Sequence, residues 1–323
     1  MPLRSAHSAT FWFKVVCAGF VGFSIAANGA LAQSQPAATL GGTILPDDEP
    51  VNVGDSPVGY IDNAIPGTQF RLRFDAAYDN KRPGRAEFFW AKAARAGGPG
   101  VKLPETTVDY QDISAYFEYA INRCTSVFGE LPVRFINPEQ NDNTGGLTDS
   151  TIGFKRALIY GNDEVLSFQL KVYIPTGDAD RGLGNNHTTI EPGLLWYKRL
   201  NDCWNLSGEL RYWVPVDGSE GFEGEVIRYG LGLGYNWYRS CDLSITPVAE
   251  FVGWTVLSGK TPITEIPPAV TIRDAAGDTI LNAKLGVRVG YGDSQQVYMG
   301  FGQALTGDRW YDQTFRLEYR ILF

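Results

Sequence analysis

The chain has 323 residues and a formal net charge of −8, and 44% of its residues are hydrophobic. Its acidity argues against nucleic acid as a partner, since nucleic-acid binding depends on basic surfaces. After residue 32, no stretch approaches the roughly 18 consecutive apolar residues that a membrane-spanning helix needs. If the protein resides in a membrane, it must therefore cross it with strands.

The first 32 residues have the features of a secretory signal peptide. Arg4 and Lys14 supply positive charge, residues 15–27 are a short apolar run, and residues 30–32 read Ala-Leu-Ala. The apolar run is too short to span a bilayer. We therefore predict export with cleavage after Ala32, which leaves 323 − 32 = 291 residues and a charge of −8 − 2 = −10.

Residues 33–66 are rich in Pro, Gly, Asp and small side chains, a composition that cannot form a core. We predict a flexible periplasmic lead-in. The sequence GYIDNAIPG at residues 59–67 could be ordered against the inner end of the domain that follows.

From residue 67 to 323, strand patterns alternate with turns. Apolar residues fill one face of each strand and polar residues the other. Each strand is at least about as long as the 9–11 residues that cross a bilayer at a tilt, and their number is even, as in bacterial barrels. We predict an all-β fold, a closed antiparallel up-and-down transmembrane β-barrel of about twelve strands. The strands are expected at 68–78, 108–122, 126–137, 149–160, 164–175, 187–199, 205–216, 224–238, 243–256, 279–291, 296–305 and 312–323.

The connections alternate in length, although two of them are nearly equal. Short periplasmic turns and longer outer loops are the asymmetry expected of an outer-membrane barrel. The short turns are expected near 123–125, 161–163, 200–204, 239–242 and 292–295. The longer connections are expected at 79–107, 138–148, 176–186, 217–223, 257–278 and 306–311.

The last ten residues, TFRLEYRILF, alternate apolar and charged side chains and end on Phe323. A soluble sandwich could also end on such a strand, but its edge would be exposed and adhesive. In a closed barrel the apolar face meets lipid and the charged face meets the interior. A terminal strand ending in Phe also resembles the signal that the barrel assembly machinery recognises.

Three hairpins look like copies of one unit: YAINRCTSVFGELPVRF, YKRLNDCWNLSGELRYW and YNWYRSCDLSITPVAEF. Each has a Cys at the turn and then a strand with an acidic residue, which is Glu130, Glu209 or Glu250. These turn cysteines are Cys124, Cys203 and Cys241, and the fourth cysteine of the chain, Cys17, lies in the predicted signal peptide. A disulfide between Cys203 and Cys241 could form but is not required.

Aromatic residues cluster near the strand ends, which favours the two interfacial belts of a membrane barrel. The inner belt is predicted to contain Trp196, Tyr197, Trp204, Trp237 and Tyr238. The outer belt is predicted to contain Trp213, Trp254, Trp310 and Tyr311.

Strand alternation assigns eighteen charged residues, eleven basic and seven acidic, to the barrel interior. They are Arg71, Arg73, Asp75, Glu118, Glu130, Arg134, Lys155, Lys171, Glu191, Glu209, Arg211, Arg228, Glu250, Lys284, Arg288, Arg316, Glu318 and Arg320. Two interpretations stay open. The charges could line a polar channel and set its selectivity, or they could pair across neighbouring strands and fill a self-plugged barrel.

Two local features depart from the simple pattern. Arg156 breaks the alternation and would face lipid, which suggests a bulge in its strand. Gly230, Gly232 and Gly234 alternate on one strand without a following helix, so they do not indicate a dinucleotide site. They are expected to leave room beside a bulky neighbour.

Residues 150–218 resemble the phenol-degradation meta-pathway family of outer-membrane proteins, whose members are often labelled transporters. The marks are Gly-Phe-Lys at 153–155, Pro-Thr-Gly-Asp at 175–178, and the Gly-Leu-Gly and Pro-Gly-Leu that follow. Residues 70–92 and 250–260 also look like planctomycete members of this group. The resemblance implies an outer-membrane barrel and passage of small, including aromatic, compounds. It supplies no binding residues.

An enzyme is the less favoured alternative. Outer-membrane phospholipases use a Ser and a His on a twelve-stranded barrel, but the only His after residue 32 is His187. It is followed by two threonines and is expected to be solvated. No G-x-S-x-G motif occurs. The loop at 176–186 could hold calcium weakly, but such loops are more often simply solvated.

We therefore predict an outer-membrane channel for passive diffusion of small solutes, anionic or aromatic in class, without catalysis, cofactor or metal. The alternative is a structural or adhesion barrel with a plugged lumen. The expected partners are outer-membrane lipid, the barrel assembly machinery through Phe323, and a small solute. The excess of basic residues in the interior favours anions.

Overall fold

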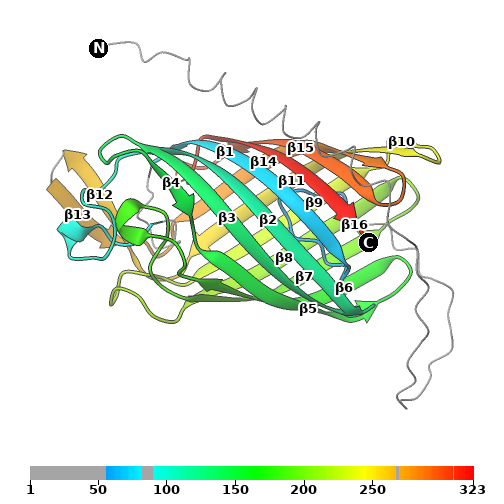
Figure 1. Ribbon diagram of the computed structural model, residues 1–323, viewed down its shortest axis with the longest axis horizontal. Helices are drawn as coiled ribbons and strands as arrows, with labels where there is room; N and C mark the ends of the chain where they lie inside the picture. The colour runs from blue at the N-terminus through cyan, green and yellow to red at the C-terminus, as the bar shows by residue number, and fades with distance from the viewer. Residues whose placement is uncertain (1–55, 82–89, 267–268, 308) are drawn as a thin grey trace, which may run out of the picture. The chain divides into compact units, whose positions relative to one another are not determined.

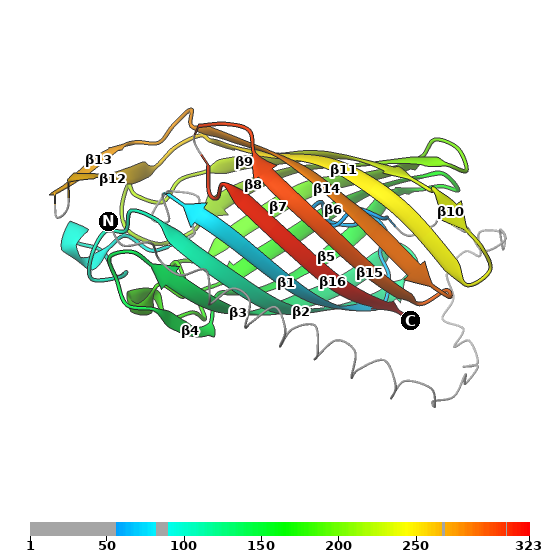
Figure 2. The ribbon, with the colours of Figure 1, turned by 90° about the horizontal axis from the view of Figure 1, so that it is seen from above.

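The computed structural model describes residues 56–81, 90–266, 269–307 and 309–323. Twelve long antiparallel strands close into a barrel (Figures 1 and 2), which confirms the predicted fold. They are β1 (Gln69–Asn80), β2 (Val108–Asn122), β3 (Thr125–Pro138), β5 (Ser150–Tyr160), β6 (Glu164–Ile174), β7 (Thr189–Arg199), β8 (Trp204–Pro215), β9 (Val226–Tyr235), β11 (Leu243–Val256), β14 (Thr279–Tyr291), β15 (Gln295–Ala304) and β16 (Gln313–Leu322).

The barrel closes between its first and last strands. β1 pairs with β2 on one side and with β16 on the other, so Arg71 lies opposite Arg320 and Asp75 opposite Arg316. The closure leaves no free edge among the long strands, which satisfies their backbone hydrogen bonds within the wall.

Several short strands and turns lie outside the twelve-stranded wall or extend it. β4 (Thr144–Leu147) pairs with β3, and β10 (Tyr238–Arg239) pairs with β11. The hairpin of β12 (Lys260–Ile266) and β13 (Ala269–Asp274) forms a separate sheet at the end of the barrel opposite the C-terminus (Figure 1). This hairpin lies inside the predicted loop 257–278 and was not expected. Two single 3₁₀ turns complete the fold, η1 (Ala94–Ala96) and η2 (Ala179–Arg181).

The two faces of each strand differ as the alternation predicts. On β3, for example, Val127, Leu131 and Phe135 are exposed on the outer surface, whereas Ser126 and Phe128 are buried inside. Similar exposed apolar side chains occur on the neighbouring strands. A continuous apolar exterior of this kind on a folded protein marks a surface that is covered by lipid or by a partner.

The two ends of the barrel differ in their connections. The inner end carries the short turns and the C-terminus, where the Phe323 amide donates to the carbonyl of Thr68 at 3.0 Å. The outer end carries the long connections. The alternation of short and long connections therefore agrees with the prediction.

Two of the three repeated turns share one structural feature. The amides of Cys124 and Cys203 donate to the side-chain oxygens of Asn122 and Asn201, each at 2.9 Å. Such an Asx turn reverses the chain without a glycine. The three cysteines in the described part of the chain, Cys124, Cys203 and Cys241, are free, so the disulfide that could have formed between Cys203 and Cys241 is absent.

Among the described residues, no helix is long and apolar enough to cross a membrane.

The predicted outer aromatic belt is wrong. Trp213 and Trp254 are 3% and 5% exposed, and they face the interior of the barrel. Trp310, from the connection between β15 and β16, packs against both, with ring centroids 5.9 Å and 4.9 Å away. These indoles fill the outer part of the lumen. At the inner end the belt prediction holds in part, because Trp204, Trp237 and Tyr238 are exposed whereas Tyr197 is buried.

Candidate functional site

The interior wall of the barrel holds all eighteen charged residues predicted for it. None of them is exposed, and each lies on the inward phase of its strand. Arg156 is the expected exception. It is exposed, its guanidinium donates to the Thr125 hydroxyl, and the register of β5 shifts directly after it, between Ala157 and Ile159.

The interior charges pair with one another, some between neighbouring strands and some across the lumen side of an intervening strand. Lys155 contacts the Glu118 carboxylate at 3.0 Å, and Arg73 lies 3.5 Å from Glu130 and 3.6 Å from Glu318. The Glu318 carboxylate also forms ion pairs with the guanidinium groups of Arg288 and Arg320, each with a nitrogen–oxygen distance of 3.1 Å. Because buried charges must be compensated, this network is what allows so polar a wall to fold.

Two acidic residues of the network were missed by the sequence analysis. Asp112 accepts two hydrogen bonds from Arg134, both at 2.8 Å. It shares the inward phase of Glu118 on β2, so the alternation contained the signal. Asp62 contacts Lys171 and Arg211, but it precedes the first strand, where no periodic signal exists. With these two, the seven predicted acids become nine against eleven basic residues in the described interior.

Residues 56–67, here called the plug segment, lie inside the barrel. Arginine side chains of the wall donate to successive carbonyl groups of the segment. Arg288 donates to Pro57 and Val58, both at 2.8 Å. Arg316 donates to the carbonyl of Gly59 at 2.6 Å. The excess of basic residues in the wall is therefore satisfied by backbone oxygens.

Glu250 holds the same segment from its amide side. Its carboxylate accepts hydrogen bonds from the backbone N–H groups of Gly59, Tyr60 and Ile61, each at 2.9 Å. The hydroxyl of Tyr298 also donates to it at 3.1 Å. Three amides converging on one buried carboxylate form an anion-binding nest, and hydrogen bonds to a charged acceptor are the strong ones.

The contacts show the path of the plug segment. Ser56 lies beside Arg320 near the inner end, and Gly59 lies beside Arg316, two inward positions further along β16. The returning arm meets Glu118 through the Gly67 amide before the chain enters β1. The segment is thus a loop inserted from the inner end, with its tip at Tyr60, which lies between Lys284 and Arg316.

The glycine stripe of β9 makes room for this loop, as expected for glycines beside a bulky neighbour. A Cβ atom on Gly232 would lie 2.7 Å from Val58, and one on Gly234 would lie 2.7 Å from Pro57. Both distances are shorter than van der Waals contact, so a larger side chain that is not bonded to the plug segment would displace it.

The plug segment differs from the flexible lead-in expected for residues 33–66. Residues 33–55 lie outside the described part of the chain. Residues 56–66 have fixed partners instead, because the wall binds their backbone groups. Their side chains therefore needed no apolar pattern, and composition alone could not reveal the interaction.

One histidine lies under the outer loops. His187 is 2% exposed, which contradicts the expectation of a solvated residue. Its Nδ1 lies 3.1 Å from the carbonyl oxygen of Asn185. Burial lowers the pKa of His187, because the charged form is poorly solvated there.

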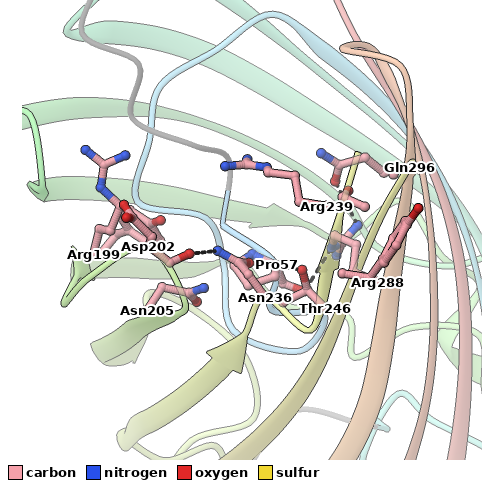
Figure 3. A pocket seen from close by; sticks show the side chains of 13 residues that line it. Pro57, Arg199, Asp202, Asn205, Asn236, Arg239, Thr246, Arg288 and Gln296 are labelled. Atoms are coloured by element: carbon pink, nitrogen blue, oxygen red, sulfur yellow. Dashed lines mark hydrogen bonds between the residues drawn. The ribbon is translucent and has the colours of Figure 1, made fainter. Parts of the chain in front are cut away.

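A cavity of about 140 Å³ opens at the inner end between the plug segment and the wall (Figure 3). Its lining is polar and includes Arg199, Asp202, Asn205 and Arg239, with Pro57 of the plug segment on one side. In the described part of the chain, no group of three or more His, Cys, Asp or Glu side chains could hold a metal ion.

The comparisons with known proteins agree with this architecture. Residues 102–237 match the protein family described as "Putative MetA-pathway of phenol degradation". The COG4313 outer membrane channel from Pseudomonas putida F1 matches with 13% identity and a TM-score of 0.50. That match covers 86% of this chain and 100% of the channel. At this identity the likeness shows the fold.

Two further barrels show weaker likeness. The KdgM porin matches with 7% identity, a TM-score of 0.43, and coverage of 78% of this chain and 99% of its own. The β domain of the Bordetella autotransporter BrkA matches with 15% identity, a TM-score of 0.45, and coverage of 80% and 100%. No curated protein matches the chain. None of these matches supports the planctomycete likeness.

Proposed function

We propose that this barrel, which matches the phenol-degradation family over residues 102–237, is an outer-membrane channel for passive diffusion of small solutes, closed in this structure by its own plug segment. The observation that carries the proposal is the combination of an apolar exterior with a charged interior whose surplus of cations is bound to a removable segment.

The location follows from the surfaces. The exposed apolar side chains of the wall suit contact with lipid, and an outer-membrane location explains why the long connections gather at one end. We propose export through residues 1–32 with cleavage after Ala32. We also propose assembly through the terminal strand, whose Phe323 side chain is 78% exposed.

Opening requires withdrawal of the plug segment towards the inner end. Its backbone is held by Glu250, Arg288 and Arg316, and water can replace these hydrogen bonds once the segment moves. The same groups would then line a wet passage, in which eleven basic residues face eight acidic ones, because Asp62 leaves with the plug segment. An open channel should therefore prefer anions, and the preference should weaken at high salt because salt screens the field.

The solute class that the family description suggests is aromatic, and the fold agrees with a non-enzymatic role, since the Pseudomonas putida protein that it resembles is named a channel. Inside the barrel, the indoles of Trp213, Trp254 and Trp310 would stack against an aromatic solute on its way through the outer part. No catalytic group is needed for this role.

Conductance in planar bilayers tests the proposal. The wild-type barrel should show brief, small openings. A variant lacking residues 33–66, with the signal peptide joined to Gly67, should show larger and longer ones with anion selectivity at low salt. A folded deletion variant that conducts no ions would overturn the proposal. It would favour the self-plugged structural barrel, an alternative that the extensive ion pairing of the interior supports.

A further inference from the structure

Two clusters of buried apolar side chains include residues that lie outside the strands of the wall. The plug cluster joins Val58, Tyr60 and Ile61 of the plug segment to the interior face of the wall. The loop cluster joins the long outer connection between β1 and β2 to the wall. It consists of Ala77, Trp90, Ala93, Val101, Val108, Tyr110, Ile136 and Tyr311. One cluster thus contains the tip of the plug segment, and the other contains part of an outer loop.

Trp310 packs against both clusters. It comes from the connection between β15 and β16, and the next residue, Tyr311, is itself a member of the loop cluster. Two adjacent side chains of a third segment therefore stand between the outer loop and the plug segment. From this pair, two chains of contacts lead to the plug tip.

The first chain of contacts ends on the backbone of Tyr60. The ring centroids of Trp310 and Trp254 are 4.9 Å apart, and the Arg228 guanidinium lies 5.4 Å from the centroid of Trp254. A cation over an aromatic face is attracted by the negative charge of that face. The same guanidinium donates to the carbonyl of Tyr60 at 2.9 Å. A group that holds the plug backbone is thus itself held by the tryptophans of the outer part.

The second chain of contacts ends on the ring of Tyr60. The Lys284 ammonium donates to the hydroxyl of Tyr311 at 2.6 Å. The same ammonium lies 3.7 Å from the centroid of the Tyr60 ring. Because an ammonium group is also attracted to an aromatic face, Lys284 links Tyr311 to the plug tip. The two chains share no side chain between the pair and Tyr60, and they reach different parts of that residue.

We infer that Trp310 and Tyr311 couple the outer loop to the plug segment, so that order in one stabilises order in the other. Packed side chains and hydrogen bonds carry such coupling, and a densely packed interior transmits displacement. The coupling is reciprocal by thermodynamic necessity, so withdrawal of the plug segment loosens the outer loop as much as displacement of the loop loosens the plug. The inference deepens the proposed function, on which it rests for its use: a solute that parts the outer loops on entry favours release of the plug.

Hydrogen exchange on the full barrel in detergent tests the inference and requires no conductance. The amides of Ala94 and Gly100 report on the outer loop, because they donate within it to the carbonyls of Val101 and Lys92, each at 2.8 Å. Deletion of residues 33–66, with the signal peptide joined to Gly67, should speed their exchange at least about fivefold, the lower end of ordinary coupling between sites.

The same deletion is then repeated in a background that carries Trp310→Ala and Tyr311→Phe. If the pair transmits the effect, the two changes are not additive, and the deletion should alter exchange in this background by less than about twofold. Circular dichroism checks that each variant is folded, and Trp310→Leu replaces Trp310→Ala if the alanine variant does not fold.

Tyr229→Ala is the matched control. Tyr229 follows Arg228 on β9, so it lies on the opposite face of the strand, and within the described chain it belongs to neither cluster. In its background the deletion should keep its full effect on Ala94 and Gly100. Unchanged exchange of these two amides on deletion, or an equal increase with and without the Trp310–Tyr311 pair, would overturn the inference. Absence of conductance in planar bilayers would bear only on the proposed channel.

Discussion

Replacement of Glu250 by Gln should loosen the plug segment without changing the shape of the wall. The Glu250 carboxylate accepts three backbone N–H groups at 2.9 Å. A hydrogen bond to a charged group contributes about 1.5–3 kcal/mol, and a neutral one about 0.5–1.5 kcal/mol. Gln keeps one acceptor oxygen, so the closed state should lose about 2–4 kcal/mol relative to the open one. A free-energy difference of about 1.4 kcal/mol changes an equilibrium constant tenfold. The ratio of closed to open channels should therefore fall roughly 30-fold to several hundred-fold.

Single-channel recording measures this ratio directly as the fraction of time spent open. The matched control is Glu130→Gln, because Glu130 also faces the interior but pairs with Arg73 of the wall and contacts no described residue of the plug segment. The control should keep the open fraction of the wild type. Equal open fractions in Glu250→Gln and Glu130→Gln would refute the argument that Glu250 holds the plug.

Three further predictions concern assembly, topology and the outer loops. Phe323→Asp should lower the amount of barrel recovered in the outer membrane, and normal recovery would exclude a role for Phe323 in assembly. Cys203 and Cys241, both exposed on inner turns, should react with an impermeant thiol reagent only after the outer membrane is permeabilised, and labelling in intact cells would invert the topology. Because burial lowers the pKa of His187, the folded outer loop favours the neutral ring, so its stability falls as the pH drops below the ordinary value of about 6.5. Amides of residues 175–188 should exchange faster, after correction for intrinsic rates, at pH 6 than at pH 7.5. This difference should vanish in His187→Gln, and its persistence there would assign the effect to another group.

The wall of the barrel could be predicted from the sequence because each strand carries its own two-residue alternation. A residue such as Lys155 or Glu209 faces inward in the structure for the same reason that it stands between apolar neighbours in the sequence. The alternation also identifies the exception, because Arg156 directly follows an inward lysine. Strand ends were accurate because the turns differ in composition from the wall.

The same alternation also predicts that two tryptophans of the supposed outer belt face inward. Trp213 follows the inward Arg211 by two residues, and Trp254 follows the inward Glu250 by four, so both share the inward phase. The belt prediction used only their positions along the strands. Position alone cannot separate a side chain that faces lipid from one that fills the outer part of the lumen.

The plug segment could not be predicted because its main interactions are made by the backbone. The carbonyls of Pro57 and Val58 and the amides around Tyr60 would be available in any sequence. The relevant signals lie in the wall instead. The surplus of inward arginines requires hydrogen-bond acceptors, and the alternating glycines on β9 leave space in the lumen. Together they indicate a further segment inside the barrel that supplies oxygen atoms and fills that space.

The central claim is that the plug segment closes the channel and must move for solutes to pass. A reversible disulfide between the plug segment and the wall tests it most directly. A Cβ atom on Gly232 would lie 2.7 Å from a Cγ of Val58, so cysteines at these two positions can meet at bonding distance with a small adjustment. In a background with Cys124, Cys203 and Cys241 changed to Ser, the oxidised pair Val58→Cys and Gly232→Cys should abolish conductance. Reduction should restore it in the same bilayer. Undiminished conductance of the fully oxidised protein would contradict the account, because solutes would then pass with the plug segment fixed in place.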